Sequence, residues 1–104
     1  MRKADLVTAI SEKTGVPKVD VLVTLETLFK EVKSSLAEGE NVYIRGFGSF
    51  VIKERKRKIG RHIKKGIAIE IPAHFVPSFK PAKTFVEEVK TKVNSLPKDE
   101  SNNV

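Results

Sequence analysis

Residues 42–53 read VYIRGFGSFVIK, in which two alternating segments flank a Gly-Phe-Gly turn. Val42 and Ile44 alternate with other side chains before the turn, and Phe50 and Ile52 do so after it. A period of two is typical of strands with one buried face. A phosphate-binding glycine loop would instead open a helix and contain a Lys-Ser/Thr pair. The stretch therefore predicts two antiparallel strands joined by a tight turn.

Upstream of this stretch, the apolar period is helical. Residues 3–14 place Leu6, Val7 and Ile10 on one side, and Gly15 follows as a stop. A second helix is predicted between Pro17, which suits a first helical turn, and Gly39, which suits a C′ position. Its apolar stripe repeats at spacings of three and four residues and comprises Leu22, Leu25, Phe29, Val32 and Leu36.

Downstream, the second strand is expected to continue through a basic segment and to return. The reversal is predicted between Gly60 and Gly66, and the return strand over residues 67–71, where isoleucines alternate with other residues. Pro72 interrupts it, an extended piece follows over residues 75–79, and a third helix is predicted from Pro81. The resulting fold class is α+β.

The net charge of +7 is concentrated in one segment. Residues 53–65 hold eight cations and one anion, whereas the rest of the chain carries 12 of each. A basic segment on a neutral body favours a polyanion, above all nucleic acid. A solvated loop and a membrane surface remain alternatives. A hairpin from about Lys53 to Pro72 would extend about 20–25 Å, and its charges prevent burial against the body, so we expect a partner to order it.

Other function classes lack the residues they need. The chain has no cysteine, so disulfide frameworks, zinc ribbons and thiolate catalysis are excluded. The two histidines, His62 and His74, have no nearby acidic cluster of metal-ligand spacing, and Ser49 lacks a recognisable triad partner. We expect no enzyme activity, no cofactor and no metal. No apolar run is long enough to span a membrane, and no secretory signal is apparent, so a cytoplasmic location is expected.

The aromatic content indicates a homodimer. Three short helices and a small sheet cannot bury six phenylalanines within one chain of 104 residues. We predict a shared core between two copies, with two arms extending from it. The phenylalanines assigned to that core are Phe29, Phe47, Phe50 and Phe79.

Over residues 1 to about 94, the sequence resembles the HU/integration host factor (IHF) family of bacterial histone-like, DNA-bending proteins. The motifs that carry the resemblance are RGFGSF at residues 45–50, Gly60-Arg61, and VPSFKPAK at residues 76–83. It implies an intertwined homodimer with an α-helical base, a saddle-shaped antiparallel sheet and two β-ribbon arms that follow the minor groove of DNA. We expect the arm to span about residues 53–75, and the composition of residues 95–104 predicts a flexible tail.

The resemblance also implies a set of DNA-binding residues. Body cations that meet flanking phosphates correspond to Lys3, Lys80 and Lys83, and Arg45 is a candidate for the minor groove. Arm cations correspond to Lys53, Arg55, Lys58 and Arg61, with Lys56, Arg57, Lys64 and Lys65 as additional basic neighbours.

The arm tip departs from the family pattern. Residues 60–66 read GRHIKKG, so Ile63 stands where the family has a proline that wedges between base pairs. His62 replaces an asparagine and is a candidate for contacts with the DNA backbone or base edges. Isoleucine is an accepted wedge in minor-groove binders. The predicted function is an architectural, nucleoid-associated protein that bends and compacts duplex DNA and favours bent, nicked or distorted sites. The alternative is a basic-arm RNA-binding or assembly protein.

Overall fold

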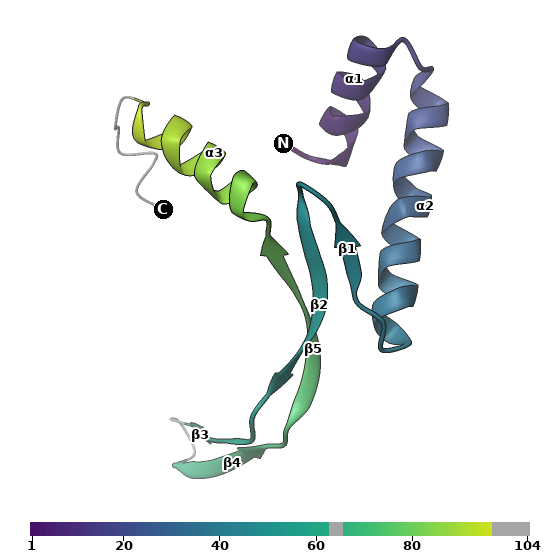
Figure 1. Cartoon of the computed structure of the whole chain (residues 1–104). Coiled ribbons are helices and arrows are strands. Elements are labelled where there is room, and N and C mark those ends of the chain that lie inside the picture. Colours follow the sequence, from purple (N-terminus) through teal and green to yellow (C-terminus); the bar gives the residue numbers. More distant parts are fainter. Residues whose placement is uncertain (63–65, 97–104) are drawn as a thin grey trace. The chain divides into compact units, whose positions relative to one another are not determined.

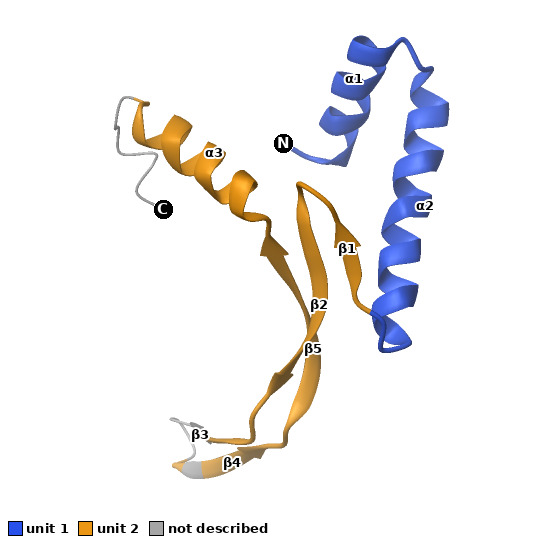
Figure 2. Ribbon diagram, viewed as in Figure 1, with its two compact units in different colours: residues 1–40 blue, residues 41–104 orange. Residues whose placement is uncertain are grey.

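The structure, a computed structural model, describes residues 1–62 and 66–96. Within that part of the chain, two helices precede five strands and a third helix follows them (Figure 1). The elements are α1 (Lys3–Thr14), α2 (Lys18–Ala37), β1 (Val42–Ile44), β2 (Gly48–Arg55), β3 (Lys58–His62), β4 (Ile67–Ile71), β5 (His74–Pro81) and α3 (Lys83–Asn94). Residues 1–40 and 41–104 form two compact units, which are coloured separately in Figure 2.

The first unit is a pair of helices whose ends follow the predicted signals. Gly15 adopts a φ of 78° after α1, and its N–H donates to the carbonyl of Ser11 at 2.8 Å. Gly39 adopts a φ of 88° after α2. Both are left-handed conformations that glycine adopts without steric cost. Val7 on α1 and Val21 on α2 are buried, and the predicted limits of both helices are confirmed.

The second unit is built on a three-stranded antiparallel sheet in the order β1-β2-β5. The turn between β1 and β2 is closed by a hydrogen bond of 3.0 Å from the Phe47 N–H to the Ile44 carbonyl. The Phe47 carbonyl in turn accepts a hydrogen bond of 2.9 Å from the Ala82 N–H, just before α3. The predicted strand–turn–strand at residues 42–53 is therefore confirmed, and its turn also holds the start of the third helix.

Gly48 marks a close approach between β2 and β5. A Cβ atom at this position would lie 2.5 Å from the Lys80 carbonyl oxygen and 2.6 Å from Cζ of Phe79. No ordinary side chain fits at such distances, so glycine permits the Phe79 ring to pack directly over the backbone of β2. The second glycine of the Gly-Phe-Gly motif is therefore needed for packing.

The outer part of the arm is a separate two-stranded sheet of β3 and β4. The prediction of a continuous strand beyond Lys53 is wrong, because residues 56–57 interrupt it between β2 and β3. Residues 72–73 interrupt the returning side opposite, as Pro72 indicated. Gly60 lies within β3 and pairs with Ile69, and the ladder ends with the pair His62–Ile67, so the pairing reaches into the stretch in which the reversal is predicted.

The third helix begins later than the sequence indicated. Pro81 is the last residue of β5, opposite Gly48, and α3 begins at Lys83. A proline is tolerated there because β5 is an edge strand, where a missing N–H need not break a ladder. The expected tail, 95–104, lies mostly outside the described residues, and the division into 1–94 and 95–104 stays a prediction.

Candidate nucleic-acid interface

The register of β2 and β5 separates two kinds of side chain. Phe50 pairs with Phe79, whereas Ser49 pairs with Lys80 and Lys53 with Val76. Paired residues in an antiparallel sheet point to the same side, and successive residues point to opposite sides. The phenylalanines therefore lie on one face, and Lys53, Arg55 and Lys80 lie on the other.

The cationic face continues into a groove at the base of the arm. Arg55 pairs with His74 across the last step of the β2–β5 ladder, and Lys58 pairs with Ile71 in the first step of the arm. The groove between these steps is lined by three predicted cations and by apolar side chains, and its lining residues are Arg55, Lys56, Lys58, Ile71, His74, Val76 and Pro77.

His74 lies in this groove and is exposed. Its Nδ1 lies 2.9 Å from the carbonyl oxygen of Pro72. This contact crosses the break between β4 and β5, so His74 helps to define the backbone at the base of the arm.

One arm cation is partly neutralised within the chain. Nε of Arg57 lies 2.7 Å from Oε1 of Glu70, and both side chains are exposed. Arg57 lies in the break between β2 and β3, and Glu70 lies on β4. Lys53, Arg55, Lys56 and Lys58, which are also predicted cations of the outgoing side, are exposed.

Two body cations line a second groove on the same unit. Arg45, in the turn, and Lys80, on β5, both line it together with Tyr43, Ser49 and other residues of the turn. Lys83 is exposed in the first turn of α3. The structure thus brings Arg45 and Lys80 together, which their separation of 35 positions in the sequence did not indicate.

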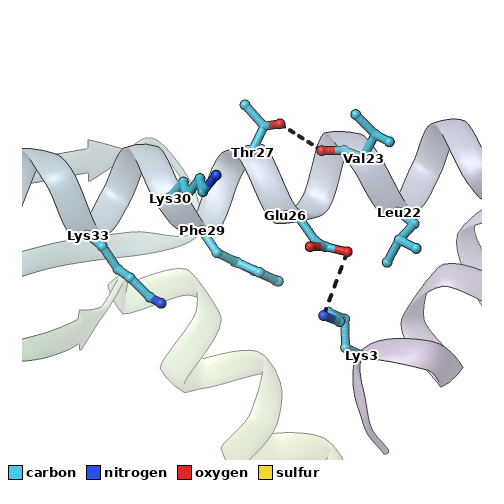
Figure 3. Close-up of a pocket in the computed structure, with 8 residues that line it drawn as sticks. All are labelled: Lys3, Leu22, Val23, Glu26, Thr27, Phe29, Lys30 and Lys33. Atoms are coloured by element: carbon cyan, nitrogen blue, oxygen red, sulfur yellow. Dashed lines mark hydrogen bonds and ion pairs between the residues drawn. The ribbon is translucent and has the colours of Figure 1, made fainter.

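Lys3 belongs to the first unit, where it borders a groove along α2. Its Nζ lies 3.8 Å from Oε1 of Glu26. Figure 3 shows that Leu22, Glu26, Phe29 and Lys33 extend from one side of α2, while Val23 and Thr27 extend from the opposite side. Phe29 is 41% exposed in this groove. The lysine and the predicted dimer-core phenylalanine therefore border one surface of this unit.

The arm tip is only partly described. Arg61 and His62 form the end of β3 and pair through their backbones with Ala68 and Ile67. The predicted DNA contacts of their side chains, and those of Ile63, Lys64 and Lys65, lie outside the described part of the chain.

The comparison with known proteins agrees with this arrangement. The family model described as "Bacterial DNA-binding protein" matches residues 1–90. The SPbeta prophage-derived DNA-binding protein HU 2 of Bacillus subtilis (strain 168) is 40% identical over 92 residues, which are 88% of this chain and 100% of the relative. Integration host factor subunit beta of Marinobacter nauticus is 41% identical over 90 residues, 86% of this chain and 92% of the relative.

This chain belongs to the HU/IHF family. Its structure is similar to that of Anabaena HU in a cocrystal with DNA, with a TM-score of 0.81 and 38% identity over 86% of this chain and 97% of that one. The resemblance found in the motifs at residues 45–50 and 76–83 is confirmed, and so is the α+β fold.

Four of the six phenylalanines of this HU/IHF-family chain, Phe47, Phe50, Phe79 and Phe85, form one cluster in the second unit. The Phe79 ring centroid lies 4.9 Å from that of Phe50 and 5.3 Å from that of Phe47. Phe85 on α3 joins the cluster, with its ring stacked 5.3 Å from Phe47. The predicted core omitted Phe85, although its spacing with Val89 and Val93 showed an apolar helix face. Phe47 and Phe79 remain 45% and 37% exposed, so the cluster is incompletely covered by its own chain.

Proposed function

We propose that this chain is an architectural protein that binds duplex DNA through the minor groove and bends it. The observation that carries the proposal is the separation of the sheet into a cationic face with Lys53, Arg55 and Lys80 and an aromatic face with Phe50 and Phe79. Cations aligned on one exposed face can replace the counterions condensed on a phosphate backbone. Membership of the HU/IHF family supports a DNA partner.

The contacts divide between the body and the arm. Body cations bind phosphates that flank the bend, and Arg45 reaches toward the minor groove from the turn. Cations on both sides of the ribbon contact the phosphates along the minor groove of the DNA. The residues in these roles are Lys3, Lys80 and Lys83 for the body, and Lys53, Arg55, Lys56, Arg57, Lys58, Arg61, His62, Lys64 and Lys65 for the arm.

Ile63 supplies the wedge at the arm tip. It is the apolar residue between Arg61-His62 and Lys64-Lys65. Minor-groove proteins that bend DNA insert apolar side chains between base steps, and extra contacts to the bent duplex offset the cost of unstacking. Nicked or distorted DNA lowers that cost, so we expect such DNA to be preferred.

The functional unit is a homodimer. Within the described residues, only Val7 and Val21 are buried apolar side chains. Phe29, Phe47 and Phe79 each keep more than a third of their surface exposed. A stable domain buries its large aromatic side chains. A second copy that covers these phenylalanines, together with Phe50, supplies the missing core and yields the two-armed, saddle-shaped dimer.

The proposed role places the protein on DNA, in the nucleoid of the cytoplasm, without a catalytic function, cofactor or metal. No helix within residues 1–62 and 66–96 has the length and apolarity needed to cross a membrane. The proposed domain comprises residues 1–94, with the arm at about 53–75 and a flexible tail at 95–104.

The proposal is tested by gel shift combined with a bend measurement. Intact DNA, nicked DNA and duplex RNA of the same length and sequence are compared. We expect the order of affinity to be nicked DNA, intact DNA and then RNA, and we expect shortened end-to-end distances by energy transfer on both DNAs. Equal or tighter binding to the RNA duplex, or binding without bending, would contradict the architectural role.

A further inference from the structure

Tyr43 is the exposed aromatic residue of β1, and the sheet register places it among the cations. It pairs with Ser49, which in turn pairs with Lys80, so the three residues form one row across the sheet. The row lies on the cationic face and opposite the phenylalanine cluster. Tyr43 is 72% exposed, so its ring contributes little to the core of this unit.

A hydrogen-bonded chain orients the Tyr43 hydroxyl. The backbone N–H of Ile52 donates to Oδ1 of Asn41 at 3.0 Å, which fixes the Asn41 amide just before the start of β1. Nδ2 of Asn41 then donates to the Tyr43 hydroxyl oxygen at 3.3 Å. Because that oxygen accepts from Asn41, the hydroxyl proton is directed to a different acceptor.

The surroundings of Tyr43 match a ligand with anionic and acceptor groups. Arg45 and Lys80 line the same groove as the tyrosine, with the small Ser49 between Tyr43 and Lys80. Phosphates of DNA can pair with the two cations. Sugar oxygens, phosphate oxygens or the acceptors at the floor of the minor groove can accept the hydrogen bond from the Tyr43 hydroxyl. An aromatic ring adds an apolar surface for a deoxyribose.

We propose that Tyr43 is a further DNA-binding residue, which packs against the sugar-phosphate backbone between phosphates held by Arg45 and Lys80 and donates its hydroxyl proton to the DNA. The inference rests on the proposed DNA-binding function. It differs from the cation contacts in one measurable respect, because a contact made by a neutral side chain releases no counterion.

The test compares four variants by anisotropy titration of a labelled, nicked DNA duplex at several salt concentrations. We expect Tyr43→Ala to weaken binding about tenfold and Tyr43→Phe about threefold to fivefold, the loss of one hydrogen bond. Both should keep the wild-type slope of log affinity against log salt. Lys80→Ala should instead reduce that slope by about 1 for each phosphate that the lysine neutralises.

Phe75→Ala is the matched control. Phe75 is similarly exposed, at 68%, but pairs with Glu54 and therefore lies on the opposite face of the ribbon. We expect this variant to bind like the wild type. Tyr43→Phe affinity within the error of wild type, together with a Tyr43→Ala loss no greater than that of Phe75→Ala, would overturn the proposal. A failure of wild-type protein to bind DNA at all would instead overturn the proposed function.

Discussion

Nε of Arg57 lies 2.7 Å from Oε1 of Glu70, so an ion pair connects the break between β2 and β3 to strand β4. The side chains are 64% and 59% exposed. Exposed pairs of this kind contribute only about 0–1 kcal/mol to stability. Glu70 is also the one acidic residue in the segment 55–71. We therefore expect Glu70 to act mainly by lowering the positive charge that the arm presents to DNA.

Replacing Glu70 should strengthen DNA binding. In Glu70→Gln, Arg57 is released for a phosphate, so we expect tighter binding and a salt slope steeper by about 1 per arm engaged. The melting temperature should change little. Anisotropy titrations over a salt series measure the slope. Glu54→Gln serves as the control, since it removes an equal charge from the face of the β2–β5 sheet opposite Lys53 and Arg55, and equal slopes in the two variants would contradict a specific role of the Arg57–Glu70 pair.

Removing arm cations should weaken binding through counterion release. The triple replacement of Arg55, Lys58 and Arg61 by alanine should flatten the plot of log affinity against log salt by about 2–3 units per arm engaged. The same titrations measure this. An unchanged slope would place the interface elsewhere on the protein.

The wedge is tested at Ile63. Ile63→Ala should keep most binding to intact duplex but reduce both bending and the preference for nicked DNA, because a smaller side chain unstacks the bases less effectively. Ile63→Pro should maintain or increase the bend, since proline keeps an apolar wedge and restricts φ. Energy transfer across the duplex measures the bend. Parent-like bending by Ile63→Ala would identify Ile63 as a turn residue only.

The dimer is tested at Phe50, whose ring packs against Phe79. Truncation of a buried phenylalanine typically costs about 3–5 kcal/mol, so Phe50→Ala should dissociate or unfold the protein. Sedimentation and thermal melting measure the two outcomes. The exposed Phe75 offers a control, because Phe75→Ala should leave the dimer intact. A wild-type chain that sediments as a folded monomer at micromolar concentration would rule out the homodimer.

Gly48 should tolerate no side chain. We expect Gly48→Ala to destabilise the protein by about 1–3 kcal/mol, as overpacked cores do, because the added Cβ meets Lys80 and Phe79. Chemical denaturation measures the change. At Gly60 a Cβ would meet its nearest atom at 3.7 Å, an ordinary contact. Gly60→Ala should therefore change stability by less than about 0.5 kcal/mol, and similar losses in the two variants would refute the close approach at Gly48.

The helix limits were predictable because their signals are local. Gly15 and Gly39 supply the left-handed conformation after α1 and α2, and the apolar spacing marks the helical stretches between them. The start of α3 was misplaced at Pro81 because proline suits both a first helical turn and an edge strand. Its pairing with Gly48, which is distant in the sequence, decides for the strand.

The sequence showed most of the residues of the candidate site but only part of their arrangement in space. The cations of the arm follow from a run of charges. The approach of Arg45 to Lys80, the position of Tyr43 beside them and the entry of Phe85 into the aromatic cluster depend on which strands pair and where α3 begins. The period of an isolated segment shows that it has an apolar face without showing what that face contacts.

The sequence by itself therefore determined the limits of the first two helices, the strand–turn–strand at residues 42–53 and a basic hairpin that carries the net charge. These depend on backbone preferences and charges within a few neighbouring residues. Only the tertiary structure decided that Lys53, Arg55 and Lys80 share a face opposite Phe50 and Phe79, and that residues 56–57 break the ribbon. The physical reason is register: a shift of one residue in strand pairing moves every side chain to the other face, and the pairing is set by contacts between residues far apart in the chain.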